Sequence, residues 1–382
     1  MTRSKLTTPR LFAGVAAASA LLAACGSATT ASTTSAQTSS PACWATATTI
    51  QACGGMNALI KAARAEGHLN AIALPSNWAN YGSIIAAFEK RYGITVNVAN
   101  PEGSSGEELA ALKTEKGTAK EPDVVDVGLS FALQGQQEHL FAPFKVPTWS
   151  EIPANQKAAN GDWFEDYGGL IAVGYNAGAV PRPTSLASLT QPAYKGSVCL
   201  DGNPESAGAA FSGVFAAALA NGGSYANIAP GIAYFQRLHQ AGTFVPTGAT
   251  AASIEAGQCR VTLDWTYLQA QYASQLAGKV TWKSFIPSNA HVAAYYVQAI
   301  SANAPDPAAA RLWETYLYSP AGQNGWLEGY AYPVELKAMI ANGTVNRAAL
   351  AKLPPLPSNL AFPTASELAS AAKTVVAEWP TV

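Results

Sequence analysis

The sequence predicts an α/β fold, because segments with strand patterns alternate with segments that have helical patterns. Residues 68–74 (HLNAIAL), 94–98 (ITVNV) and 122–127 (PDVVDV) are short apolar or β-branched runs typical of strands. Helical patterns separate these runs, and such an alternation indicates a domain with a mainly parallel sheet. The chain has 382 residues, which is enough for two domains.

The individual elements follow from spacing and from end signals. Residues 56–66 and 81–92 place apolar side chains at helical spacing, and Gly93 ends the second helix. Ser105 with Glu108 predicts a capping box for the next helix. The later strands are expected at 168–176, 194–200, 259–265 and 291–301. The later helices are expected within 181–189 after a turn, in a segment that ends at 220, at 228–241, 267–276 and 307–318, in a segment that begins at 321, and in the Pro-rich tail after 354.

The first 24 residues have the plan of a secretory signal peptide. A basic start with Arg3, Lys5 and Arg10 precedes an apolar run, residues 11–22, that is too short for a membrane span. Residues 22–25 (LAAC) resemble a bacterial lipobox, which implies cleavage before Cys25 and a lipid on its sulfur. The alternative is an ordinary signal peptide in which Cys25 has no role.

Residues 25–42 are expected to be a flexible tether. They consist mainly of Ser, Thr, Ala and Gln, which offer too little apolar surface to offset the entropy of ordering. Together with a lipid on Cys25, this segment would hold the folded body at the outer face of the cytoplasmic membrane, at the cell surface or in the periplasm.

Composition limits the classes of function. Apolar residues make up 49% of the chain, charged residues 12%, and the formal net charge is -1. A large core is therefore expected, and the lack of a basic block argues against nucleic acid as a partner. We expect a monomer without cofactors.

The cysteines indicate disulfides rather than a metal site. Without Cys25, four cysteines remain, and an even number in an exported chain suggests disulfides. We favour the pairs Cys43–Cys53 and Cys199–Cys259 over buried free thiols. The second pair would join two predicted strands. Zinc is not expected, because the sequence has no Cys-x-x-Cys and its four histidines are isolated from one another.

Several segments resemble family 1 extracellular solute-binding proteins of ABC importers. They are NYGSIIAAFEKRYGITVNV, PDVVDVG, LIAVGYNAGAV, and the most specific stretch, YYVQAISANAPDPAAARLWETYLYSPAGQNGWLEGYAYPV. The resemblance implies a periplasmic-binding-protein-like type II fold, in which crossing strands join two α/β lobes around a ligand cleft. It places lobe 1 at 43–174 and 291–335, and lobe 2 with the C-terminal helices at 175–290 and 336–382. The implied partners are a small solute and a membrane permease.

Candidate ligand-binding residues lie where the predicted strands end, since ligands of open α/β sheets bind beyond the carboxyl ends of the strands. Each has a plainer reading as well: Trp78 packing on Tyr81, Ser105 as a helix cap, Trp265 in a lobe core. The candidates are Trp78, Ser104, Ser105, Ser130, Phe131, Ser206, Asp264, Trp265 and Tyr267.

The placing of Trp78, Ser130-Phe131 and Asp264-Trp265 looks most like the polyamine-binding branch of the family, so the favoured solute is a polyamine such as putrescine or spermidine, or a similar organic cation. Indole faces beside a carboxylate suit such a cation. An aminophosphonate, thiamine or ferric iron is the alternative within the family. Ferric iron is in doubt, because the relatives that bind it have a Tyr pair where this chain has only Tyr267, and Tyr295-Tyr296 lies inside a strand.

A secreted hydrolase is the alternative of another class, and we expect no enzymatic activity. The turn at residues 128–132 (GLSFA) lacks the final Gly of a nucleophile elbow. The carboxylate pair Glu107-Glu108 is expected on an exposed helix face, away from any site.

Overall fold

The computed structural model describes residues 41–357, 360 and 362–382. The signal peptide (1–24), Cys25 and most of the tether (25–42) lie outside these residues, so the predictions made for them stay predictions. By its contacts the chain divides into units 1–36 and 37–382, and every described residue belongs to the second. Within the described part, no helix is both long and apolar enough to span a bilayer.

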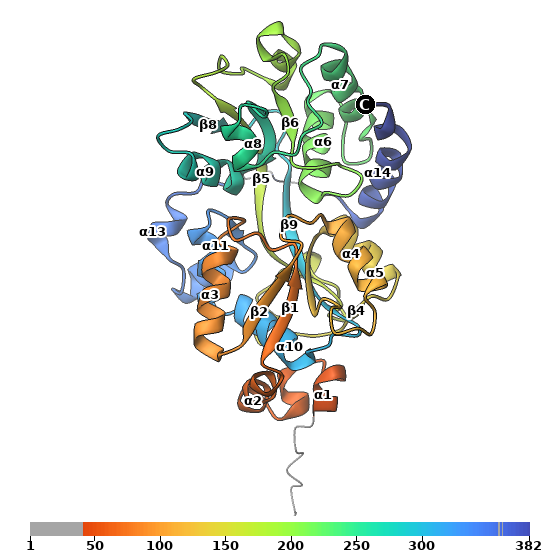
Figure 1. The fold of residues 1–382 in the computed structure, drawn as a ribbon, viewed down its shortest axis with the longest axis vertical. Helices are drawn as coiled ribbons and strands as arrows, with labels where there is room; N and C mark the ends of the chain where they lie inside the picture. The colour runs from red at the N-terminus through yellow and green to blue at the C-terminus, as the bar shows by residue number, and fades with distance from the viewer. Residues whose placement is uncertain (1–40, 358–359, 361) are drawn as a thin grey trace, which may run out of the picture. The chain divides into compact units, whose positions relative to one another are not determined.

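The second unit contains two α/β lobes. In the first lobe, helices cover the strands that precede the crossing to the second lobe, and later segments return to it (Figure 1). Its elements are α1 (Pro41–Thr46), η1 (Ile50–Cys53), α2 (Met56–Glu66), β1 (His68–Ile72), α3 (Tyr81–Tyr92), β2 (Thr95–Ala99), α4 (Ser105–Thr114), β3 (Val124–Gly128), α5 (Leu129–Gln137), β4 (Phe141–Ala142), η2 (Ala154–Gln156), α10 (Pro307–Leu317), α11 (Pro320–Glu328) and β10 (Tyr332–Pro333).

The second lobe is built around a parallel pair of strands, with apolar helices packed beside them. Helix α6 is buried along nearly its whole length, as its run of Ala, Val and Phe requires. The elements of this lobe are η3 (Leu186–Thr190), η4 (Pro192–Tyr194), β6 (Val198–Leu200), α6 (Gly208–Ala220), α7 (Ala229–Gln240), α8 (Ala251–Glu255), β7 (Val261–Trp265), α9 (Thr266–Gln275) and β8 (Trp282–Phe285).

Two long strands, β5 (Phe164–Asn176) and β9 (Ala293–Ser301), connect the lobes. Residues 164–170 of β5 pair with β9, and residues 171–176 pair with β7 and β8. Strand β5 therefore belongs to the sheets of both lobes. The order of the strands across them is β3-β9-β5-β7-β6. The expectation of a mainly parallel sheet is wrong: β1–β2 and β6–β7 are parallel, but every pairing of β5 and β9 is antiparallel.

The cap of α4 differs from the prediction by one residue. Ser104, not Ser105, is the N-cap, and Glu107 at the third helical position completes the capping box. Ser105 and Glu108 are both buried instead, so Glu108 does not lie on an exposed face. The reason is that their side-chain oxygens accept hydrogen bonds from the backbone of β3, at Gly128 and Asp126 respectively.

The chain after residue 335 contacts both lobes. Helices α12 (Leu336–Asn342) and α13 (Arg347–Leu350) pack with α11 and β10, which favours counting them with the first lobe. Helix α14 (Ala365–Glu378) contacts α5 of the first lobe and α7 of the second, and Trp379 of η5 (Trp379–Thr381) packs on Phe235. The lobe boundaries given above stay predictions.

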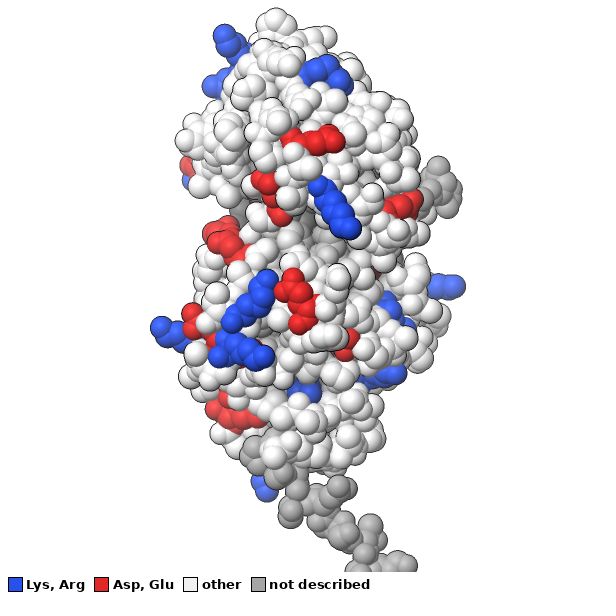
Figure 2. All heavy atoms as spheres, turned by 90° about the vertical axis from the view of Figure 1, so that its right-hand side faces the viewer, with Lys and Arg blue, Asp and Glu red and all other residues white. Residues whose placement is uncertain are grey.

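Charged side chains of both signs are scattered over the face of the molecule that Figure 2 draws, and most of that face is uncharged. This matches the low charged fraction of the sequence, 12%. A broad basic surface of the kind that binds nucleic acid is not seen on that face.

Both predicted disulfides are confirmed. Cys43 and Cys53 are bonded, with their Cα atoms 5.9 Å apart. Cys199 and Cys259 are bonded, with Cα atoms 5.6 Å apart. The first closes the turn that contains η1, and the second links β6 to the segment that leads into β7.

The two bonds should differ in their effect on stability, because a cross-link that closes a longer loop removes more entropy from the unfolded chain. The Cys199–Cys259 bond spans 60 residues and the Cys43–Cys53 bond spans 10. We predict losses of about 4 and about 3 kcal/mol when each pair is replaced by alanines. Urea unfolding of the two double variants measures this, and a smaller loss for the Cys199/Cys259 pair would contradict it.

Candidate functional site

A cavity between the lobes, here called the acidic cavity, lies where the strands end. Its volume is about 120 Å³. The loops after β1 and β2 and the end of β3 supply its first-lobe wall, and the residues between β6 and α6 supply the second. The lining residues are Ala73, Pro75, Trp78, Glu102, Gly103, Ser104, Ser105, Glu108, Asp126, Asp201, Gly202, Ala207, Gly208, Ala209 and Tyr296.

Asp126 is the most constrained acid in this cavity. It is 5% exposed, and its Oδ2 accepts hydrogen bonds from the Tyr81 and Tyr167 hydroxyls, both at 2.7 Å. Its Oδ1 has no hydrogen-bond partner among the described residues. A buried carboxylate oxygen without a partner is costly, so this atom points to a missing donor or cation.

A hydrogen-bonded chain fixes the position of Asp126. The Trp78 indole Nε1 donates to the Tyr167 hydroxyl at 2.7 Å, which in turn donates to Asp126. On the other side, Gln298 Nε2 donates to the Tyr81 hydroxyl at 2.9 Å and to Asp166 Oδ2 at 2.9 Å. The cavity acid is therefore held by residues of α3, β5 and β9.

The pKa of Asp126 is raised to about 7, mainly by burial, while the hydrogen bonds from Tyr81 and Tyr167 oppose the rise. Asp126 in turn raises the pKa values of Glu108, Asp166 and Glu314, each of which is buried and raised first by burial. The pKa of Asp126 lies near neutral pH, so this carboxyl can ionise there.

The second-lobe wall adds another titrating acid. Asp201 has its pKa raised to about 7 by burial and then by repulsion from Glu102. A smaller hollow of about 40 Å³ shares Trp78, Glu102 and Asp201 with the acidic cavity and adds Gln271, whose buried Oε1 has no partner in the described part of the chain. Among the described residues, neither lining includes a Lys or Arg.

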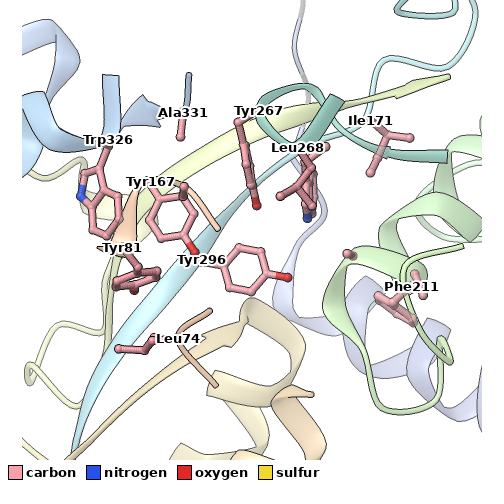
Figure 3. Packing of buried hydrophobic residues seen from close by; sticks show 14 of the residues in the cluster. Leu74, Tyr81, Tyr167, Ile171, Phe211, Tyr267, Leu268, Tyr296, Trp326 and Ala331 are labelled. Carbon is pink, nitrogen blue, oxygen red and sulfur yellow. The ribbon is translucent and has the colours of Figure 1, made fainter. Parts of the chain in front are cut away.

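Aromatic rings from both lobes close one side of the acidic cavity. Trp78 contacts Tyr296 edge-on at 5.6 Å and Tyr267 at 5.9 Å between ring centroids. Tyr296 stacks on Tyr167, with the rings 5.6 Å apart and 4° from parallel. Figure 3 shows the rings of Tyr167, Tyr267 and Tyr296 grouped around the crossing strands, with the hydroxyl of Tyr296 directed away from Tyr167.

A second and larger cavity, here called the apolar cavity, has a volume of about 280 Å³. It adjoins the acidic cavity, because Gly208 and Tyr296 line both. Its wall also includes Gly128 and Trp265. The rest of its lining is Leu129, Ser130, Leu133, Asn155, Gln156, Trp163, Glu165, Phe211, Ser212, Phe215, Tyr225, Val292, Ala293, Ala294, Tyr295, Phe362, Pro363, Thr364, Ala365 and Leu368.

The structure brings five of the predicted site residues to these two cavities. Trp78, Ser104 and Ser105 line the acidic cavity. Ser130 and Trp265 line the apolar cavity. The plainer reading had Trp78 packing on Tyr81; its ring contacts Tyr296 and Tyr267, and its indole N–H donates to Tyr167.

The other four lie beside the cavities. Asp264 is fully buried, and its oxygens accept from the Trp265 backbone N–H and the Tyr272 hydroxyl. Tyr267 is fully buried and stacks on Trp265. Phe131 lines a hollow beside α14.

Ser206 belongs to a contact between the lobes. Its carbonyl oxygen accepts from the Gly106 N–H at 3.0 Å. A Cβ built on Gly208 would lie 3.2 Å from the Gly128 Cα, so these two glycines also meet across the cleft. The glycines permit this close approach because they have no side chain.

Sequence reasoning did not single out Asp126 or Asp201, and it considered Glu108 and Tyr296 but did not count them among the site residues. The signals were present: Asp126 interrupts an apolar strand, and Asp201 directly follows the strand that ends at Leu200. An acid in a buried strand is a candidate functional group, because it must be paired or must titrate.

The family of the chain is established by comparison with known proteins. The model of the bacterial extracellular solute-binding proteins matches residues 83–352. A search of curated proteins found no match. Among solved structures, the chain resembles the periplasmic binding protein AfuA of Actinobacillus pleuropneumoniae with fructose-6-phosphate bound, at 18% identity and a TM-score of 0.63, covering 82% of this chain and 98% of that one.

Two further solved structures share the fold. One is a protein of Listeria monocytogenes assigned to spermidine/putrescine ABC transport, at 15% identity and a TM-score of 0.62, with 82% of this chain and 99% of that one covered. The other is iron-bound HitA of Pseudomonas aeruginosa, at 18% identity and a TM-score of 0.59, with 82% and 99% covered. The two-lobe fold predicted from sequence is confirmed, and the chain belongs to the bacterial extracellular solute-binding proteins.

Proposed function

We propose that this solute-binding protein captures a small organic cation in the acidic cavity and delivers it to an ABC permease. The observation that carries the proposal is the unpartnered Oδ1 of Asp126, a buried carboxylate oxygen in the wall of a cavity lined by further acids. An ammonium group supplies the hydrogen-bond donor and the positive charge that this atom lacks.

The aromatic wall supports the same class of solute. Trp78 and Tyr296 present rings beside the acids, and a desolvated cation over such a ring gains about 2 kcal/mol. Polyamines are one such class, in keeping with the assignment of the Listeria relative. A phosphate or other anion is less well supported, because four carboxyl groups and, among the described residues, no Lys or Arg line the cavity, so an anion would meet no opposite charge there.

Capture would follow from closure of the cleft. The solute reaches the acids while the lobes are apart, and the contacts Gly106–Ser206 and Gly128–Gly208 form as they close. Closure removes water from Asp126 and Asp201 and so strengthens their attraction to the cation. The solute is released unchanged. Asp264 lies behind the wall, where burial and then repulsion from Asp201 raise its pKa.

The affinity for an organic cation should rise with pH. The ionised form of Asp126 binds the cation, and its pKa is raised to about 7, so its ionised fraction grows about tenfold between pH 6 and pH 8. An ammonium group stays charged over this range. We predict a roughly tenfold tighter Kd for 1,4-diaminobutane at pH 8 than at pH 6, measured by calorimetry.

Asp126→Asn keeps the shape and the hydrogen bonds from Tyr81 and Tyr167 but cannot ionise. It should bind 1,4-diaminobutane at least about tenfold more weakly at pH 8 and lose most of the pH dependence. The matched control is Asp162→Asn, an acid of the same lobe that lines neither cavity. Equal affinities of Asp126→Asn and the wild type would refute the role of Asp126.

Substitution of Gly208 should hinder closure. An alanine Cβ would lie 3.2 Å from the Gly128 Cα, so one of the two segments would have to shift by a few tenths of an ångström for the lobes to meet here. We predict for Gly208→Ala a several-fold weaker affinity with an unchanged melting temperature of the free protein. Gly178→Ala, at an exposed position with nothing closer than 3.4 Å, is the control. Unaltered affinity would mean that this glycine contact is not part of the bound state.

We also propose that a lipid on Cys25 anchors the protein. The support is the sequence alone: the apolar run leads through Ala23 and Ala24 to the cysteine. Cys25→Ser should move the protein from the membrane fraction to the soluble fraction. Retention of the variant on salt-washed membranes would contradict the anchor.

A further inference from the structure

The apolar cavity is larger than the acidic cavity and has a different character. Its volume of about 280 Å³ compares with about 120 Å³. Rings from both lobes, from β9 and from the C-terminal segment surround it: Trp163, Phe211, Phe215, Trp265, Tyr295 and Phe362. Cavities lined in this way bind apolar parts of small molecules.

The two cavities share walls, so one solute can reach both. Gly208 and Tyr296 line each of them. The Tyr296 hydroxyl lies 3.6 Å from the position that a Cβ on Gly208 would occupy. In Figure 3 this hydroxyl points to the side on which Phe211 lies.

Glu165 is the one acidic or basic residue in the described lining of the apolar cavity. It is 3% exposed, and its Oε2 accepts a hydrogen bond from Gln156. Burial raises its pKa to about 8, so it is mostly neutral at pH 7. The apolar cavity therefore lacks the ionised partner that a second ammonium group would need.

We propose that the solute carries its ammonium group at one end and an uncharged hydrocarbon or aromatic body at the other, which fills the apolar cavity. This rests on the proposed function, since the ammonium end binds at Asp126. The solute class is then an alkylamine or arylalkylamine, rather than a polyamine with charges at both ends. A polyamine would place its far ammonium group in a cavity whose described lining holds one carboxyl group, whereas four carboxyl groups line the acidic cavity.

Two matched series of amines test the proposal. In the first, butylamine is extended to hexylamine, and in the second 1,4-diaminobutane is extended to 1,6-diaminohexane. Each buried methylene tightens binding about fourfold, so hexylamine should bind at least about tenfold more tightly than butylamine. The diamines should show no such gain, because their extension carries a charge into the apolar cavity.

Variants identify the cavity that produces the gain. Phe211→Leu replaces a ring of the apolar wall with a smaller side chain. It should remove at least half of the difference in log Kd between butylamine and hexylamine. Phe235→Leu is the matched control, because Phe235 is a buried phenylalanine of the same lobe that lines neither cavity. Calorimetry at pH 7 on the wild type and both variants gives the comparison.

The outcomes separate this inference from the proposed function. A gain for the alkylamines that Phe211→Leu reduces and Phe235→Leu preserves supports the proposal. Diamines that bind while the alkylamine series is flat would overturn this inference and leave the cation-binding function standing. Failure of every amine to bind would overturn both.

Discussion

The carboxylate of Asp126, with one oxygen held and the other free, is the constraint on which the proposed site depends. Tyr81 and Tyr167 both donate to Oδ2, while Oδ1 has no partner in the described part of the chain. An acid satisfied on both oxygens would have little reason to bind a cation. An acid without the tyrosines would be too costly to ionise in so buried a place. The pair of hydroxyl donors permits ionisation and keeps the free oxygen in the cavity wall.

The crossing strands connect this acid to the movement of the lobes. Tyr167 lies on β5 and Tyr296 on β9, and the two rings stack beside Trp78. The Trp78 indole donates to the same Tyr167 hydroxyl that holds Asp126. A change in the position of either lobe therefore changes the surroundings of the carboxylate. In this account, binding and closure are coupled because they use the same rings.

The sequence predicted most of the long helices from local patterns, the two-lobe class from the resemblance to a known family, and both disulfides from the even number of cysteines and the segments that they would join. It placed Trp78 and Ser105 near the site, because strand ends meet at one edge of a sheet. It did not identify Asp126 or Asp201. Their role depends on which oxygens are left without partners, and that depends on Tyr81 and Tyr167, which are far apart in the sequence. The shift of the α4 cap by one residue has a similar cause, since distant backbone groups of β3 bind Ser105 and Glu108.

The release of protons on binding tests the central claim most directly. If a cation binds the ionised forms of Asp126 and Asp201, whose pKa values are raised to about 7, binding near neutral pH must expel protons from the protein. Calorimetry of an amine at pH 7 in buffers of different ionisation enthalpy measures the number of protons exchanged. The account predicts a net release that is reduced in Asp126→Asn. A binding enthalpy that does not depend on the buffer would contradict it.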